Sequence, residues 1–122
     1  MTALIVFAHG STVAAANQSI HDMAARVAAG SGYVSEAAFL EIAEPDLPAA
    51  TKSLVERGVS RIVVLPYFLA PGRHAERDLP RIIEELQSIH KEVKIEAAAN
   101  LDGHPALVGI LLDRAAAVLE EH

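Results

Sequence analysis

Residues 61–70, RIVVLPYFLA, are apolar at almost every position after the first arginine. A strand covered on both faces has this composition, whereas a strand with one face in water alternates apolar and polar residues. Residues 3–8, ALIVFA, show the same uninterrupted pattern. We therefore predict that these two segments form the centre of a parallel β-sheet.

Two further segments have the mixed composition of edge strands. They are residues 33–42, YVSEAAFLEI, and residues 93–99, VKIEAAA, in which polar side chains interrupt the apolar ones. Because the mixed strands belong at the edges and βαβ crossovers are right-handed, the predicted strand order is 2-1-3-4.

Segments with apolar residues at helical spacing lie between and after these strands. Gly30 and Gly32 follow the first of them and are predicted to end it. The predicted helices cover residues 13–29, residues 45–57, a segment with Asp78 as its N-cap and a segment that begins near Pro105. The order βαβαβαβα predicts a single α/β domain over residues 1–122, with a four-stranded parallel sheet and helices on both faces.

The composition argues against several classes of protein. The chain has 122 residues, 52% of them hydrophobic, a formal net charge of −6 and no cysteine. Without cysteine there is neither a disulfide framework nor a thiolate metal site, and no Lys/Arg cluster marks a nucleic-acid-binding surface. The apolar runs are shorter than the roughly 20 residues of a membrane span, and the first residues, MTALIVFAHG, lack the pattern of a signal peptide. We expect a cytoplasmic protein that binds neither membranes nor nucleic acids.

Chemically distinctive residues fall at one edge of the predicted sheet. In an open parallel sheet, ligands bind beyond the carboxyl ends of the strands, where the strand order reverses. His9 follows the first strand, Glu41 ends the second, and His74 lies in the loop predicted after the third. Imidazole and carboxylate groups suit iron, cobalt, nickel or zinc, and they also suit acid–base chemistry near neutral pH.

Each of these residues also has a purely structural interpretation. His9 can hold the turn after its strand, His74 can be a solvated loop side chain, and Glu41 can be a surface acid. His104 also falls at this edge, but it most simply caps the last helix, which is the interpretation that we adopt. Their common position is what favours a functional site.

Two further groups of residues accompany this edge. Ser11 and Asn17 flank the start of the first helix, where such residues serve as caps and turn residues. Gly10 and Ser11 can alternatively present amide groups to an anionic ligand at the helix N-terminus.

Arginines gather around His74 in a chain whose net charge is negative. They are Arg73, Arg77 and Arg81. They can form ion pairs with the acidic residues nearby, or they can form a local cationic rim for a polycarboxylate ligand.

Four blocks of the sequence resemble the short-form CbiX-type sirohydrochlorin chelatases. These are FAHGS with Asn17 further on, FLEIAEPDLPAA, VVLPYFLAPGRHAERDLP and LDGHPALV, in this order and at this spacing. The resemblance runs from residue 4 to about residue 112. It implies a chelatase-like fold and an enzyme that inserts Co²⁺ or Fe²⁺, or Ni²⁺ as in archaeal relatives, into sirohydrochlorin for cobalamin or siroheme biosynthesis.

The resemblance also implies roles for particular residues. It places the metal-handling histidines at His9 and His74 and their acidic partner at Glu41. Arg73 and Arg77, with Gly10 and Ser11, are then expected to bind the anionic tetrapyrrole. The metal ion is then a substrate, so no permanently bound cofactor is expected. The resemblance also implies a homodimer with its cleft between the subunits. Thr12 stands where many members of the family carry an arginine.

Other functions on the same fold make different demands on the sequence. A non-catalytic tetrapyrrole- or metal-binding protein would bind the ring or the metal without accelerating insertion. A phosphate-binding protein of the flavodoxin type would need a loop rich in Gly, Ser and Thr, and HGSTVAAAN is a poor one. A hydrolase with Ser11 as its nucleophile would need the G-x-S-x-G turn, which the sequence around this serine lacks.

Overall fold

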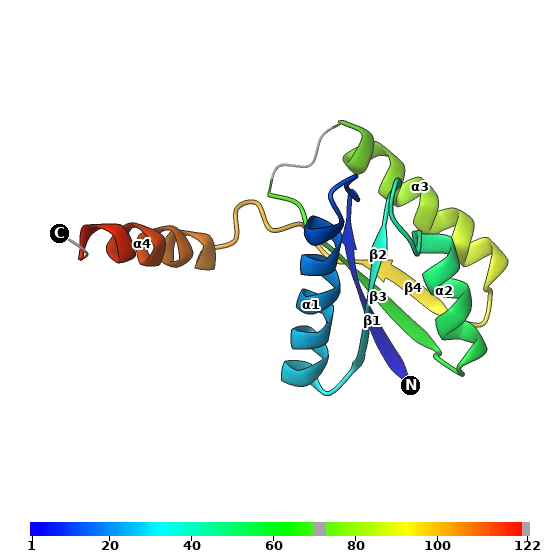
Figure 1. Ribbon diagram of the computed structural model, residues 1–122. Helices are drawn as coiled ribbons and strands as arrows, with labels where there is room; N and C mark the ends of the chain where they lie inside the picture. Colours follow the sequence, from blue (N-terminus) through cyan, green and yellow to red (C-terminus); the bar gives the residue numbers. More distant parts are fainter. Residues whose placement is uncertain (70–72, 121–122) are drawn as a thin grey trace.

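The structure is a computed structural model that describes residues 1–69 and 73–120, with the side chains of residues 73–77 outside the description. Strands and helices alternate along the chain, and the four strands form one parallel sheet in the order β2-β1-β3-β4 (Figure 1). The predicted fold class and strand order are confirmed. The elements are β1 (Thr2–Ala8), α1 (Ala14–Ser31), β2 (Val34–Phe39), α2 (Leu47–Glu56), β3 (Arg61–Pro66), α3 (Arg73–Ile89), β4 (Lys94–Ala97) and α4 (Ala106–Leu119).

Helices α2 and α3 cover one face of the sheet (Figure 1). From the strands this face presents Ile5, Phe7, Ile62 and Val64, all fully buried. The helices contribute further buried side chains, Leu54 of α2 among them. Burial of each such side chain stabilises the fold by about 1.5–3 kcal/mol, so this face holds most of the hydrophobic core.

Helix α1 covers only part of the other face. It packs on β1 and β2, where Val6, Ala8, Ala37 and Phe39 are buried under it. Beyond β1, the same face of β3 is only half covered, at Val63 and Leu65. The apolar composition of residues 61–70 is typical of a strand covered on both faces. The described residues, however, cover only one face of β3 fully and leave the other half covered.

The ends of α1 and α2 follow the local chemistry of the sequence. Gly32 adopts the left-handed conformation with φ of 77°, and its amide donates to the Ala28 carbonyl oxygen at 2.9 Å. Gly32 therefore ends α1, whereas Gly30 lies within the last turn. Asp46 caps α2, because its carboxylate accepts a hydrogen bond from the Ala49 amide at 2.8 Å.

The prediction that Asp78 caps the third helix is wrong. Helix α3 begins at Arg73, and Pro80 lies inside it. Residues 73–77 include Arg, Ala and Glu, which favour helix, so the helix extends upstream of the Asp-Leu-Pro sequence that resembled its start. The Asp78 carboxylate lies 3.6 Å from Arg81 Nη2, an ion pair within the helix. His74 consequently belongs to the first turn of α3 and not to a loop.

Helix α4 projects away from the rest of the molecule (Figure 1). None of its side chains is buried, although its sequence, ALVGILLDRAAAVL, is strongly apolar. In the described residues, no helix is both long enough and apolar enough to cross a membrane.

Candidate functional site

The segments that follow β1 and β2 lie in direct contact at the carboxyl edge of the sheet. The Leu40 amide donates to the Ala8 carbonyl oxygen at 2.9 Å, and the Glu41 amide donates to the His9 carbonyl oxygen at 3.1 Å. These bonds continue the strand pairing past the end of β2 at Phe39. Glu41 is thus two residues beyond its strand, beside His9, and both side chains are exposed.

Gly10 makes this contact possible. Its φ is 93°, and a Cβ atom at this position would lie 2.0 Å from the Glu41 carbonyl oxygen. Only glycine combines this backbone conformation with such a close approach. Ile42, next to Glu41, has a φ of 73°, which is rare for a β-branched residue. The loop that carries Glu41 is therefore held in an unusual backbone conformation against residues 9 and 10.

An aromatic contact orients the His9 side chain. Its ring lies edge-on to that of Phe68, with centroids 4.8 Å apart, and the Phe68 ring is in turn edge-on to Phe7 at 5.9 Å. Phe68 is buried and belongs to the segment after β3. The imidazole therefore packs on a fixed apolar support while its exposed side faces solvent. It sits between the ends of β1 and β3, where the strand order reverses.

Asn17 fixes the turn that leads from His9 into α1. Its side chain accepts a hydrogen bond from the Ser11 amide at 2.9 Å and donates to the Ser11 carbonyl oxygen at 2.8 Å. The Ser11 hydroxyl accepts a hydrogen bond from the Val13 amide at 3.0 Å. Ser11 and Asn17 are therefore turn residues as predicted, but the predicted cap role is wrong, because the N-cap of α1 is Val13 and no side chain caps it. Because the Ser11 amide is already bonded, the hydroxyl proton is the donor that Ser11 can offer to a ligand.

The backbone of α3 brings His74 to the same edge. Arg73, His74 and Arg77 belong to the first turns of this helix, whose N-terminal end lies at the edge where β1 and β2 end (Figure 1). Their side chains are outside the described part of the structure. Among the side chains that are described, no three His, Cys, Asp or Glu residues gather in the way that a complete metal site requires.

The arginine cluster divides into two parts. The Arg81 guanidinium lies 3.6 Å from Asp78 and 3.5 Å from Glu85, so its charge is used in ion pairs along α3. The ion-pair interpretation therefore holds for Arg81. Arg77 and Arg73, about one and two turns nearer the edge, remain the predicted carboxylate-binding residues.

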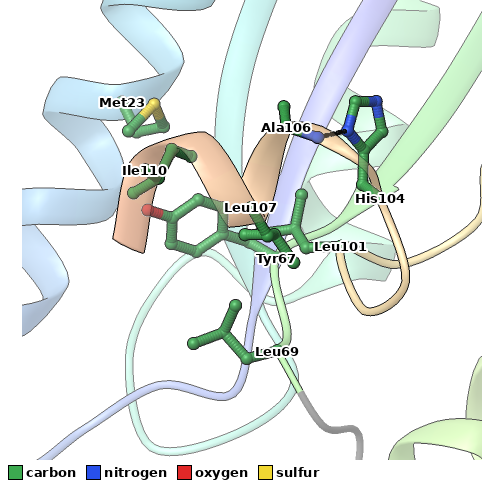
Figure 2. Close-up of a pocket in the computed structure, with 8 residues that line it drawn as sticks. All are labelled: Met23, Tyr67, Leu69, Leu101, His104, Ala106, Leu107 and Ile110. Atoms are coloured by element: carbon green, nitrogen blue, oxygen red, sulfur yellow. Dashed lines mark hydrogen bonds between the residues drawn. The ribbon is translucent and has the colours of Figure 1, made fainter. Parts of the chain in front are cut away.

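Two cavities flank this edge. One, of about 510 Å³, is lined by the loop of residues 40–46, which includes Glu41. The other, of about 490 Å³, is strongly apolar and lies between α1, the segment after β3 and the first turns of α4 (Figure 2). Its wall consists of Met23, Tyr67, Leu69, Leu101, His104, Ala106, Leu107 and Ile110.

The apolar cavity is a feature that the sequence analysis missed. Tyr67 and Leu69 alternate with the buried Phe68, so the period-two pattern of the segment already placed them on the opposite face. The role predicted for His104 is confirmed, because its Nδ1 accepts a hydrogen bond from the Ala106 amide at 3.0 Å (Figure 2). His104 is therefore a helix cap at the rim of this cavity.

The arrangement suits the transient binding of a transition-metal ion. An exposed imidazole and a nearby carboxylate supply fewer protein ligands than a closed structural metal site, which leaves coordination positions open. The carboxylate can also accept protons. A site of this kind can hold a metal ion and release it to another ligand.

Comparison with known proteins identifies the relatives of this chain. It is 34% identical over 84 residues to a sirohydrochlorin cobaltochelatase of Methanococcus maripaludis, which covers 68% of this chain and 58% of that protein. It is 33% identical over 115 residues to a sirohydrochlorin cobaltochelatase of Sulfolobus acidocaldarius, which covers 94% and 90%. A chloroplastic sirohydrochlorin ferrochelatase of Arabidopsis thaliana is 30% identical, covering 91% and 50%. The chain thus spans half to two thirds of the length of several curated relatives.

Solved structures agree with this assignment. A putative cobalamin biosynthesis CbiX protein of Marinobacter aquaeolei superposes with a TM-score of 0.87 at 30% identity, over 100% of both chains. The sirohydrochlorin chelatase SirB of Bacillus subtilis, in complex with cobalt, superposes with a TM-score of 0.85 at 26% identity, over 93% of this chain and 49% of that one. The CbiX family model matches residues 3–118, nearly the whole chain. This protein therefore belongs to the CbiX family.

Proposed function

We propose that this protein is a metal chelatase that inserts a divalent metal ion into sirohydrochlorin. One observation carries the proposal. The CbiX match spans residues 3–118 and so includes the whole edge where His9, the Glu41 loop and the first turn of α3 come together. Similar proteins are named sirohydrochlorin cobaltochelatase or sirohydrochlorin ferrochelatase.

Co²⁺ is the metal that we expect, with Fe²⁺ and Ni²⁺ as alternatives. Relatives from Methanococcus and Sulfolobus are named cobaltochelatases, and the SirB structure holds cobalt. Imidazole and carboxylate bind all three ions, and the order of affinities does not by itself select one. The ion is a substrate, and its product would serve cobalamin or siroheme biosynthesis.

In the proposed reaction, His9 and His74 hold the metal ion while coordination positions stay open for the nitrogen atoms of the ring. Two pyrrole N–H groups must lose their protons as the metal enters. The exposed carboxylate of Glu41, beside His9, accepts one, and a histidine that has released the metal accepts the other. The Phe68 contact keeps the His9 ring in place during this transfer.

The remaining residues of the edge would bind the substrate. Arg73 and Arg77 would pair with its carboxylates, since guanidinium groups bind carboxylates in a bidentate geometry. The Ser11 hydroxyl and the close-packed turn at Gly10 would border the ring. The apolar cavity beside Tyr67 and Leu69 offers a contact for the flat face of a macrocycle.

We also propose that the protein acts as a homodimer with the cleft between the subunits. The resemblance to short-form chelatases supports this assembly, and the chain corresponds to 49% of the SirB chain. A cytoplasmic location stays a prediction from the sequence, which cell fractionation would test.

The decisive experiment is an anaerobic absorbance assay with sirohydrochlorin and Co²⁺, Fe²⁺ or Ni²⁺ in turn, against a control without enzyme. Metal insertion changes the absorption bands of the ring, so the rate is read directly. We expect insertion well above the spontaneous rate, and a loss of about 100-fold in His9→Ala and in His74→Ala. His90→Ala, which removes a histidine at the far end of α3, is the matched control and should keep full activity.

Other results would contradict the proposal. Full activity in both the His9→Ala and His74→Ala variants would reject the assigned site. A spectral shift on mixing with sirohydrochlorin, without faster insertion, would identify a non-catalytic tetrapyrrole-binding protein of the same fold.

A further inference from the structure

Helix α4 carries an apolar surface that no other described residue of this chain buries. Its exposed large side chains range from 51% exposed for Ile110 to 73% for Leu119. At 100° per residue all of them except Ile110 fall within one sector of the helix, with Asp113 on the opposite side. We call this surface the α4 stripe, which consists of Val108, Leu111, Leu112, Ala115, Val118 and Leu119.

The sheet carries a second apolar surface, which the described residues only half cover. On β3, Ile62 and Val64 are fully buried under α2 and α3, while the alternate residues Val63 and Leu65 are half-buried. The register places Leu4 of β1 beside Val63. We call this surface the open strip, which consists of Leu4, Val63, Leu65 and Tyr67. It lies beside α1, and Tyr67 joins it to the apolar cavity.

The two surfaces match in chemistry and size. Helix α4 has 14 residues and is roughly 21 Å long, and β3 has 6 residues and is roughly 20 Å long. An ion pair borders the open strip at the amino end of β3, where Arg61 Nε lies 2.9 Å from Glu96 Oε2. The half-covered face of β3 is thus about as long as the apolar helix.

The segment before α4 directs the helix away from its own strip. The Ala98 amide donates to Val64 at 2.9 Å, and the Leu101 amide donates to Phe68 at 3.3 Å. His104 then caps the helix through the Ala106 amide. The first two bonds hold residues 98–101 on the body, and the chain leaves it beyond them toward α4 (Figure 1). In this conformation the stripe and the strip of one chain do not meet.

A second copy of the chain supplies what each surface lacks. The open strip of the second copy faces the α4 stripe of the first, and the α4 stripe of the second copy faces the open strip of the first. This is the reciprocal contact of a two-fold dimer. Burying both surfaces in both copies removes on the order of 1,500 Å² from water, within the range of about 1,200–2,000 Å² for stable interfaces. We propose that this protein dimerises by exchanging α4, so that the α4 stripe of each subunit packs on the open strip of its partner.

This inference rests on the homodimer proposed above and names the element that holds it together. Its first test is the mass of the full chain in solution, by light scattering. We expect twice the 12.9 kDa of one chain. Leu112→Glu, which puts a charge in the stripe, should give monomers, whereas Ala117→Glu on the opposite side of α4 should remain dimeric. A monomeric wild-type chain, or a dimer that Leu112→Glu leaves intact, would overturn the proposal.

A second test uses the absence of cysteine from the sequence. Leu65→Cys and Leu111→Cys chains with different tags are coexpressed and oxidised. Exchange predicts a disulfide between the two different chains. A third chain carries both cysteine substitutions. If a disulfide forms only within monomers of that chain, α4 folds back on its own strip. Neither test measures metal insertion, so the failure of this inference and the failure of the chelatase assignment are distinguishable.

Discussion

Single residues hold the candidate site in place through their backbone. Gly10 lets the Glu41 loop approach residues 9 and 10, and Asn17 clamps the backbone of Ser11 from the first turns of α1. These contacts act on the backbone of the site and not on the side chains of the predicted metal ligands. The position of those side chains therefore depends on how the backbone around them is held.

At this scale, Gly10→Ala should destabilise the protein and displace the Glu41 loop. The added Cβ would lie 2.0 Å from the Glu41 carbonyl oxygen at a φ of 93°. We expect the free energy of unfolding to fall by about 1–3 kcal/mol, measured by denaturant titration. Gly30→Ala is the matched control, because its Cβ would meet nothing within 4 Å in α1, and it should be neutral or stabilising. Equal stabilities for the two variants would refute this account.

The sequence identified the residues at the edge but not their full arrangement. His9 and Glu41 could be placed together because two neighbouring parallel strands end there, and topology alone requires this. The contact of His9 with Phe68 could not be predicted, because it depends on how the segment after β3 folds back over β1. The apolar cavity was missed for a related reason, since Met23 and Tyr67 belong to distant parts of the sequence.

At the scale of elements, apolar runs predicted strands reliably and boundary signals predicted helix ends less well. Strands β1 and β3 were recognised because a sheet interior requires continuous apolar side chains, although β3 ends at Pro66, before the end of the apolar run that predicted it. The start of α3 was missed because Asp78, Leu79 and Pro80 resemble a helix start, and the sequence does not reveal that favourable residues upstream continue the helix.

Asp46 gives a test of a boundary that the structure does define. Its carboxylate accepts the Ala49 amide proton at the start of α2, directly after the Glu41 loop. Asp46→Ala should lower the free energy of unfolding by about 1 kcal/mol, whereas Asp46→Asn should keep most of it, because asparagine caps equally well. Thermal unfolding followed by circular dichroism would check this. A loss of the same size in both variants would mean that the charge, not the cap, matters.

For the whole molecule, the apolar composition of β3 and of α4 has one explanation. The sequence predicted that both would be covered, but an apolar pattern does not say which chain provides the cover. If a second copy does, folding and assembly are linked, because a ligand that binds only the folded state stabilises it by an amount that grows with the logarithm of the ligand concentration.

The melting temperature should therefore depend on protein concentration. We expect a rise of about 3–5 °C for each tenfold increase in concentration of the wild-type chain. Differential scanning calorimetry over a hundredfold range would measure it, and Leu112→Glu should remove the dependence. A constant melting temperature for the wild-type chain would argue against a dimer that is required for full stability.

Residues 98–101, which are hydrogen-bonded to the body before the chain leaves it for α4, have a consequence for how such a protein can change. If α4 already packs on the partner subunit, as proposed, a linker that joined two copies end to end would have only a short distance to span. Such a fusion would raise the effective concentration of one half near the other to the millimolar range that is typical of short tethers. It would no longer need two identical halves. One half could then keep the metal-binding residues while the other lost them and specialised in shaping the cleft.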